Sequence, residues 1–355
     1  MKKIVMTGGG TGGHVTPNLA LIPRLLEDGW EVHYIGGKDS VEQEMIGRLP
    51  DVTYYGVSVG KLRRYFDPKN FSDPFRVVKG VSEASRVIRT IRPNVVFSKG
   101  GFVSVPVVYG AKMNHVPVVT HESDMTPGLA NKLCLPFASV QCCTFPEAVP
   151  YARGKGVYTG TPIRSEVFAG SHASARKGFG FDENKPVLLV MGGSTGAQAV
   201  NECVRAALPA LNETFQVLHL CGRGNLSDAF AHTANYVQKE YLDAEMADAY
   251  ACADVMISRA GANSLCEILA LRKPALLIPY PSSASRGDQI LNAASFEKRG
   301  FSRVMPQSSM TPDSLTQAII ALYRDRGTLL DAMSAEPFRN GVDAVLEQIY
   351  KYAKP

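Results

Sequence analysis

The chain has 355 residues, of which 45% are hydrophobic and 20% charged; this is the composition of a folded globular protein and excludes a disordered one. Its length exceeds what one hydrophobic core usually holds, so about two domains are expected. The formal net charge is +5, the first glycine comes too early for a signal peptide, and no apolar run approaches the roughly 20 residues of a membrane span. These features predict a protein that stays in the cytoplasm.

In the first half, short β-rich runs alternate with helical patterns, as in parallel α/β proteins. Strands are expected at residues 2–7, 31–36, 52–57, 94–100, 116–122 and 139–144, and helices at residues 15–28, 75–91 and 126–135. The alternation of strand and helix patterns then becomes less regular through residues 169–185. We place the domain boundary near Pro162.

The second half repeats this plan with a strand that begins near Lys185, a glycine loop at residues 192–196 and a helix. Further strands are expected at residues 215–222, 253–261 and 274–281, and helices from about Asn263 and Asp288. A last helix, residues 341–352, either stays with the second domain or crosses back to the first. The pattern predicts an α/β fold with two Rossmann-like domains.

The cysteines and the acidic residues give no sign of a metal site. The seven cysteines have no CxxC spacing and several lie in apolar runs, so we expect reduced core residues. They are Cys134, Cys142, Cys143, Cys203, Cys221, Cys252 and Cys266. No DxD motif occurs, which argues against a metal that chelates pyrophosphate. We expect no cofactor.

Three glycine-rich loops each follow a strand: "GGGTGGH" at residues 8–14, "SKGGF" at residues 98–102 and "MGGSTG" at residues 191–196. Glycine lets backbone N–H groups and a positive helix end approach an anionic or polar ligand. The first loop matches the dinucleotide fingerprint, but the second strand ends without the acidic residue that would hold a ribose. Such loops in both domains favour a cleft that binds a donor on one side and an acceptor on the other. The alternative is that the loops are only tight turns between a strand and a helix.

Seven motifs make the interpretation specific: GGGTGGH, SKGGFVSVP, HESDMTPGLANK, GTPIR, MGGSTGA, SRAGANSLCEI and RGDQILNA. In this order they resemble the MurG family, the inverting N-acetylglucosaminyltransferases of peptidoglycan synthesis, along essentially the whole chain. The resemblance implies two Rossmann-like domains that face a cleft, the GT-B fold. It also implies transfer of N-acetylglucosamine from UDP-GlcNAc to the C4 hydroxyl of a muramoyl sugar on undecaprenyl pyrophosphate. Residues 1–162 would form the acceptor- and membrane-binding domain and residues 163–339 the UDP-GlcNAc-binding domain.

The resemblance and the chemistry together make His14 the expected catalytic base. Inversion by one displacement needs a group that takes the acceptor proton, and the helix start beside His14 favours the neutral imidazole. A capping or purely structural histidine is the alternative. The other expected contacts of the first domain are Thr11, Gly12 and Gly13 for substrate, and Gly100, Gly101, His121, Glu122 and Asp124 on the acceptor side. His121 and Glu122 equally suit a buried pair, and the family pattern has asparagine at the position of Asp124.

Donor contacts are carried over to the second half from the resemblance. Arg164 would meet phosphate charge or the nucleotide, and Glu267 would accept two ribose hydroxyls. A solvated helix residue is the alternative for Glu267. The remaining donor contacts are Ser194, Ala262, Asn263 and Ser264 around the pyrophosphate and Gln289 at the sugar. Asp288 stands where a second glutamine is expected.

Residues 61–92 hold nine basic and three acidic residues, which accounts for the positive surplus of the first half. Basic and aromatic side chains alternate there at Lys61, Arg63, Arg64, Tyr65, Phe66, Phe71 and Phe75. Such a segment suits an anionic membrane surface, so we expect a peripheral protein on the cytoplasmic face. The alternatives are nucleic acid, for which no motif is present, and a helix with one solvated basic side. Other cell-wall synthesis proteins are conceivable partners.

Two further functions remain open from the sequence. A nucleotide-sugar epimerase has the same two-domain plan but no need of a membrane segment. A UDP-sugar-binding protein without catalysis is the other.

Overall fold

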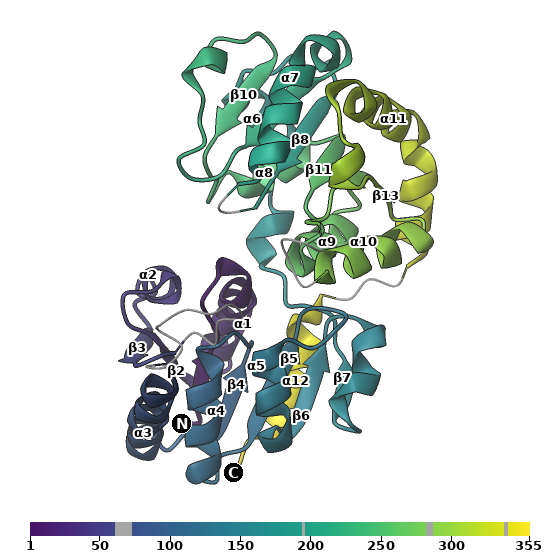
Figure 1. The fold of residues 1–355 in the computed structure, drawn as a ribbon. Coiled ribbons are helices and arrows are strands. Elements are labelled where there is room, and N and C mark those ends of the chain that lie inside the picture. Colours follow the sequence, from purple (N-terminus) through teal and green to yellow (C-terminus); the bar gives the residue numbers. More distant parts are fainter. Residues whose placement is uncertain (61–72, 194–195, 282–286, 337–339) are drawn as a thin grey trace. The chain divides into compact units, whose positions relative to one another are not determined.

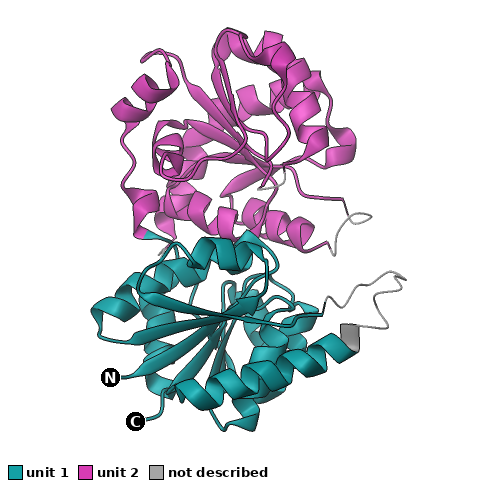
Figure 2. Ribbon diagram, turned by 90° about the vertical axis from the view of Figure 1, so that its left-hand side faces the viewer, with its two compact units in different colours: residues 1–164, 339–355 teal, residues 165–338 magenta. Residues whose placement is uncertain are grey.

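The computed structural model describes residues 1–60, 73–193, 196–281, 287–336 and 340–355 of the chain. It divides into two compact units, residues 1–164 with 339–355 and residues 165–338 (Figure 2). The first unit therefore includes two residues beyond Pro162 and also takes in the last helix, which the sequence pattern left unassigned.

Unit 1 is built on a parallel sheet of seven strands in the order β3-β2-β1-β4-β5-β6-β7 (Figure 1). The strands are β1 Lys3–Thr7, β2 Glu31–Gly37, β3 Val52–Val57, β4 Val95–Ser98, β5 Val118–Glu122, β6 Val140–Cys143 and β7 Gly156–Tyr158. The helices are α1 Thr16–Glu27, α2 Val41–Ile46, α3 Asp73–Ile91, α4 Ser104–Met113, α5 Leu129–Cys134 and α12 Gly341–Tyr352.

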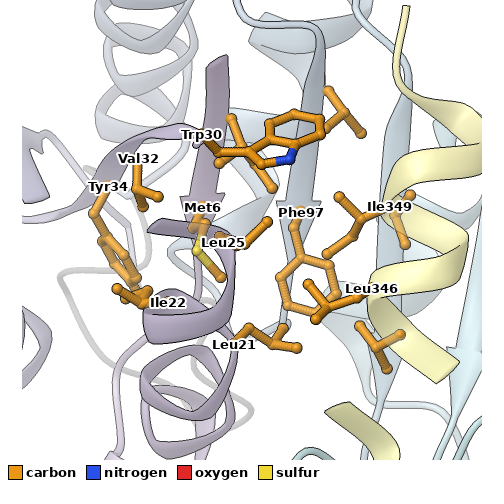
Figure 3. Packing of buried hydrophobic residues seen from close by; sticks show 14 of the residues in the cluster. Met6, Leu21, Ile22, Leu25, Trp30, Val32, Tyr34, Phe97, Leu346 and Ile349 are labelled. Atoms are coloured by element: carbon orange, nitrogen blue, oxygen red, sulfur yellow. The ribbon is translucent and has the colours of Figure 1, made fainter. Parts of the chain in front are cut away.

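Helices cover both faces of this sheet because its strands carry apolar residues on both sides. Met6 and Phe97 pack with Leu21 of α1 and Leu346 of α12 in one cluster (Figure 3). The neighbouring strand residue Val5 points the other way, into a cluster with residues of α3 and α4. Strands buried on both faces in this way are typical of doubly wound parallel sheets.

The final helix α12 is an integral part of unit 1. Val345 and Ile349 of this helix are fully buried in the same cluster as α1. The ring of Tyr350 stacks on Trp30 with centroids 5.5 Å apart, and its hydroxyl donates to Asp28 at 2.5 Å. The end of the chain thus completes the core that its beginning starts.

Unit 2 repeats the plan with six parallel strands in the order β10-β9-β8-β11-β12-β13. The strands are β8 Val187–Met191, β9 Gln216–Leu220, β10 Tyr236–Lys239, β11 Val255–Ser258, β12 Ala275–Leu277 and β13 Ser302–Val304. The helices are α6 His172–Phe179, α7 Gln198–Thr214, α8 Met246–Cys252, α9 Ala262–Ala270, α10 Asp288–Lys298 and α11 Pro312–Ala335.

Several expected elements differ from the structure. The helix expected at residues 126–135 is wrong at its start, because α5 begins only at Leu129, after Pro127 and Gly128. Eight of the described helices and strands were not expected: strands β7, β10 and β13 and helices α2, α4, α6, α8 and α11. Helix α6 falls within residues 169–185, where the sequence pattern indicated only a connecting segment. For α11 a signal is present, since Thr311 and Ser314 form a capping box ahead of an apolar pattern. All seven cysteines are free and buried, as expected.

Candidate active site

The strand order of each sheet predicts one ligand-binding position in each unit. In unit 1 the order reverses between β1 and β4, and in unit 2 between β8 and β11. At such a switch point the two loops that follow the strands diverge to opposite faces, which leaves a crevice at the carboxyl edge. The loops concerned are residues 8–14 and 99–102 in unit 1, and residues 192–197 and 259–261 in unit 2. All three glycine-rich loops lie at these positions.

The first glycine loop ends in a tight turn that carries His14. Gly12–His14 form a 3-10 turn, in which the His14 N–H donates to the Thr11 carbonyl at 3.1 Å. Gly10 has φ +85°, and a Cβ there would lie 2.4 Å from the ring of Phe102. Thr11 and Gly13 are exposed and Gly12 and His14 are half-buried. The turn therefore presents its backbone and the imidazole at the edge of the sheet.

The loop after β4 fits directly against this turn. A Cβ on Gly101 would lie 2.2 Å from the carbonyl oxygen of Gly9 and 3.1 Å from Cδ2 of His14. Both Gly100 and Gly101 have positive φ, at +94° and +81°. Two loops from neighbouring strands thus pack backbone to backbone beside the imidazole, and only glycine permits this approach.

The acceptor-side residues continue the same edge toward β5. A Cβ on Gly100 would contact Asn131, whose amide donates to Glu122 at 2.8 Å. The Glu122 carboxylate also accepts the N–H groups of Asp124 and Gly128, both at 3.1 Å. Glu122 therefore orders the loop in which Asp124 lies. The structure brings together His14, Gly101, Gly100 and this loop, with Asn131 as a link that sequence reasoning missed.

His121 and Glu122 are themselves buried side chains. His121 Nε2 lies 3.0 Å from the Gly160 carbonyl. Burial and the charge of Lys99 lower the pKa of His121 well below its ordinary value, while burial raises the pKa of Glu122. Lys99 is fully buried, and its ammonium donates a hydrogen bond to the Ser123 hydroxyl. The burial and bonding of His121 and Glu122 support a role in holding the loop rather than in contacting a ligand.

In unit 2 the helix α9 begins at the switch point. Gly261 is its N-cap, Ala262 is buried, and Asn263 and Ser264 are half-buried. The positive end of the helix dipole therefore lies at the carboxyl edge of the sheet, where an anion binds favourably. One turn on, Glu267 accepts a hydrogen bond from the Tyr250 hydroxyl at 2.6 Å.

Two neighbours of this helix start were not expected from the sequence. Arg259 is 5% exposed, and its guanidinium lies 3.6 Å from the centroid of the Tyr280 ring and donates to Gln307 at 2.8 Å. Burial lowers the pKa of Arg259. The N–H of Tyr280 in turn donates to the side chain of Gln289 at 3.0 Å. A signal was available in the sequence, because Arg259 comes directly after a buried strand and before the glycine that caps a helix.

Not every expected site residue lies at a switch point or within the described part of the chain. Arg164 is half-buried and is the last residue of the first segment of unit 1. Ser194 lies outside the described residues, as do Lys61, Arg63, Arg64, Tyr65, Phe66 and Phe71. Phe75 is described and is 79% exposed on α3.

Among the residues that the structure describes, no group of three or more His, Cys, Asp or Glu side chains is placed to hold a metal ion. No described helix combines the length and the apolar character that a membrane span requires.

Comparison with known proteins gives full-length matches. The glycosyltransferase family 28 N-terminal domain matches residues 4–140, and the family 28 C-terminal domain matches residues 187–349. A relative from Lachnoclostridium phytofermentans is 52% identical over 347 residues, 98% of each chain, and one from Lachnospira eligens is 51% identical over all of both chains. Both are named UDP-N-acetylglucosamine–N-acetylmuramyl-(pentapeptide) pyrophosphoryl-undecaprenol N-acetylglucosamine transferase.

Solved structures agree with these matches. The crystal structure of MurG from Acinetobacter baumannii matches with a TM-score of 0.77 and 26% identity over 99% of this chain and all of that one. The calicheamicin glycosyltransferase CalG4 shares the fold, with a TM-score of 0.68 at 15% identity.

The two parallel-sheet domains have the GT-B fold, and together with the family matches they define a glycosyltransferase of this type. The chain belongs to glycosyltransferase family 28. The predicted fold class and the resemblance are thereby confirmed.

Proposed function

We propose that the protein transfers N-acetylglucosamine from UDP-GlcNAc to the C4 hydroxyl of undecaprenyl-pyrophosphoryl-MurNAc-pentapeptide, which gives the disaccharide lipid and UDP in peptidoglycan synthesis. The observation that carries this proposal is identity of about half of all residues, over whole chains, with relatives that bear this transferase name. The epimerase and the non-catalytic binding protein are not favoured, because neither explains that full-length identity.

We assign the chemical steps to residues at the two switch points. In unit 1, His14 takes the proton of the acceptor hydroxyl as its oxygen attacks the anomeric carbon from the face opposite UDP. The bond between that carbon and the UDP oxygen breaks, and the configuration inverts. In unit 2, the start of α9 stabilises the charge that develops on the departing pyrophosphate. Ser194 and Arg164 add contacts to the phosphates or the nucleotide, as the resemblance implies.

The other donor contacts belong to the same proposal. Glu267, held by Tyr250, accepts the two ribose hydroxyls, and Gln289 binds sugar hydroxyls while it accepts the Tyr280 N–H. On the acceptor side, the loop that Glu122 orders and the glycines at positions 100 and 101 line the place where the muramoyl sugar binds.

The decisive experiment measures UDP release from purified protein with UDP-GlcNAc, with and without a short-chain lipid acceptor. We expect release only when the acceptor is present, together with a disaccharide product of inverted configuration. Release without the acceptor, or isomerisation of the sugar, would indicate hydrolysis or epimerisation instead. Binding of UDP-GlcNAc without any turnover would leave only a binding protein.

The protein also needs a membrane surface, because its proposed acceptor is anchored in one. On α3, Phe75 and Val78 are 79% and 69% exposed and stand among the exposed cations Arg76 and Lys79. Exposed apolar side chains flanked by cations suit an anionic lipid interface. We infer a peripheral protein on the cytoplasmic face of the membrane, bound through residues 61–79.

Neutralising Lys61, Arg63 and Arg64 together is expected to weaken binding to anionic vesicles by roughly 3 kcal/mol at most, at about 1 kcal/mol per cation. Added salt should reduce the difference, because it screens these charges. Vesicle sedimentation at two salt concentrations measures it, and turnover of a water-soluble acceptor analogue should stay intact. Neutralising the exposed Lys177, Lys239 and Lys298 of unit 2 is the charge-matched control. Equal losses from both triple variants would argue against a localised membrane surface.

A further inference from the structure

A buried carboxylate on α2 links the two loops beside the first strand of unit 1. Glu42 is fully buried, although it lies in the first turn of a surface helix next to exposed residues. One of its oxygens accepts the N–H of Gly10 at 3.1 Å, and the other accepts the N–H of Gly37 at 3.0 Å. Both oxygens of the side chain are therefore bonded to backbone groups of segments far apart in the sequence.

The surrounding glycines form a socket for this carboxylate. A Cβ on Gly9 would lie 2.4 Å from Cδ of Glu42, and one on Gly36 would meet the Tyr54 hydroxyl and lie 2.9 Å from Cγ of Glu42. Gly37 is nearly as close, at 3.1 Å from an oxygen. Side chains at these positions would displace the carboxylate. Glu42 thus accounts for the glycine at position 9 and, together with Tyr54, for the one at position 36, independently of any ligand.

The bond to Gly10 acts on the turn that carries His14. Gly10 immediately precedes Thr11, whose carbonyl accepts the His14 N–H. On its other side the loop lies against the β4 loop, where Gly10 faces Phe102. Gly9 and His14 face Gly101. Glu42 therefore fixes one side of the loop by a hydrogen bond, while the opposite side packs against the β4 loop. Without this hydrogen bond, the loop can move away from the β4 loop.

We propose that Glu42 is a positioning residue for transfer: it fixes the Gly10 backbone and thereby the place of the His14 imidazole. This rests on the proposed function, in which His14 takes the acceptor proton. A displacement of about 1 Å in a reacting group can lower turnover about 100-fold, so a bond remote from the substrate can govern the rate. Glu42 itself touches neither substrate.

The test compares Glu42→Gln with Glu44→Gln on the same helix. Glutamine keeps the size of the side chain but has one acceptor oxygen, and its NH₂ group would face a second backbone donor. Glu44 is exposed and forms an ion pair with Arg48 at the surface, so it controls for the loss of one carboxylate from α2. We expect kcat of Glu42→Gln to fall about 10- to 100-fold, with UDP affinity and KM for UDP-GlcNAc unchanged. Glu44→Gln should match the wild type.

A second variant approaches the same contact from the loop. Gly9→Ala should displace the carboxylate and lower kcat in the same way, and the double variant should lose little more than either single one, because both break one interaction. Faster hydrogen exchange at the Gly10 amide should accompany each loss. Additive losses, or a kcat of Glu42→Gln within twofold of wild type, would overturn the proposal.

The controls separate the two proposals. If wild type and Glu44→Gln show no acceptor-dependent UDP release, the proposed function itself fails. If they turn over and Glu42→Gln loses UDP affinity as much as kcat, Glu42 supports the fold generally and is not a positioning residue.

Discussion

Replacing His14 by alanine is expected to lower kcat for acceptor-dependent UDP release by about 100-fold or more, which is the usual contribution of a general base. UDP-GlcNAc should bind with unchanged affinity, because His14 is not among the proposed donor contacts. Steady-state kinetics and calorimetry with UDP measure the two quantities on the same preparation.

Two comparisons make the His14 result specific. His232→Ala removes an exposed imidazole of unit 2 and should leave kcat unchanged. Added imidazole should restore part of the turnover of His14→Ala, since the missing group is a proton acceptor at an accessible edge of the sheet. Near-normal turnover of folded His14→Ala would remove this residue from the mechanism.

Glu267→Ala is expected to weaken UDP binding and raise KM for UDP-GlcNAc by about 10- to 100-fold, the effect of losing hydrogen bonds of about 1.5–3 kcal/mol to a charged group. The reason is that two ribose hydroxyls lose one shared acceptor. Calorimetry with UDP alone isolates this contact from the sugar and from the chemical step.

Tyr250→Phe refines the same assignment. Its hydroxyl donates to Glu267 at 2.6 Å, so its removal should loosen the carboxylate and produce a smaller change in the same KM. If UDP binds to Glu267→Ala as it does to the wild type, the ribose assignment is wrong, and the Tyr250–Glu267 pair has a structural role.

The amino-acid sequence alone determined the local features of this protein. Buried parallel strands read as apolar runs, and glycine loops stand out where a strand gives way to a helix, so both halves were predicted as Rossmann-like. The loops that carry His14 and Ala262 were found for the same reason: each lies within a few residues of its strand.

Only the tertiary structure decided the contacts between distant segments. Nothing in the sequence singles out Glu42, because its bonds to Gly10 and Gly37 depend on how α2 folds onto the sheet. The burial of Arg259 against Tyr280 depends on the order of β11 and β12 in the same way. Helix α12 joins unit 1 because its apolar face completes a core begun some 300 residues earlier, around Leu21 and Trp30. Periodicity indicates that a face is buried, but the partner that buries it is set by the topology of the whole chain.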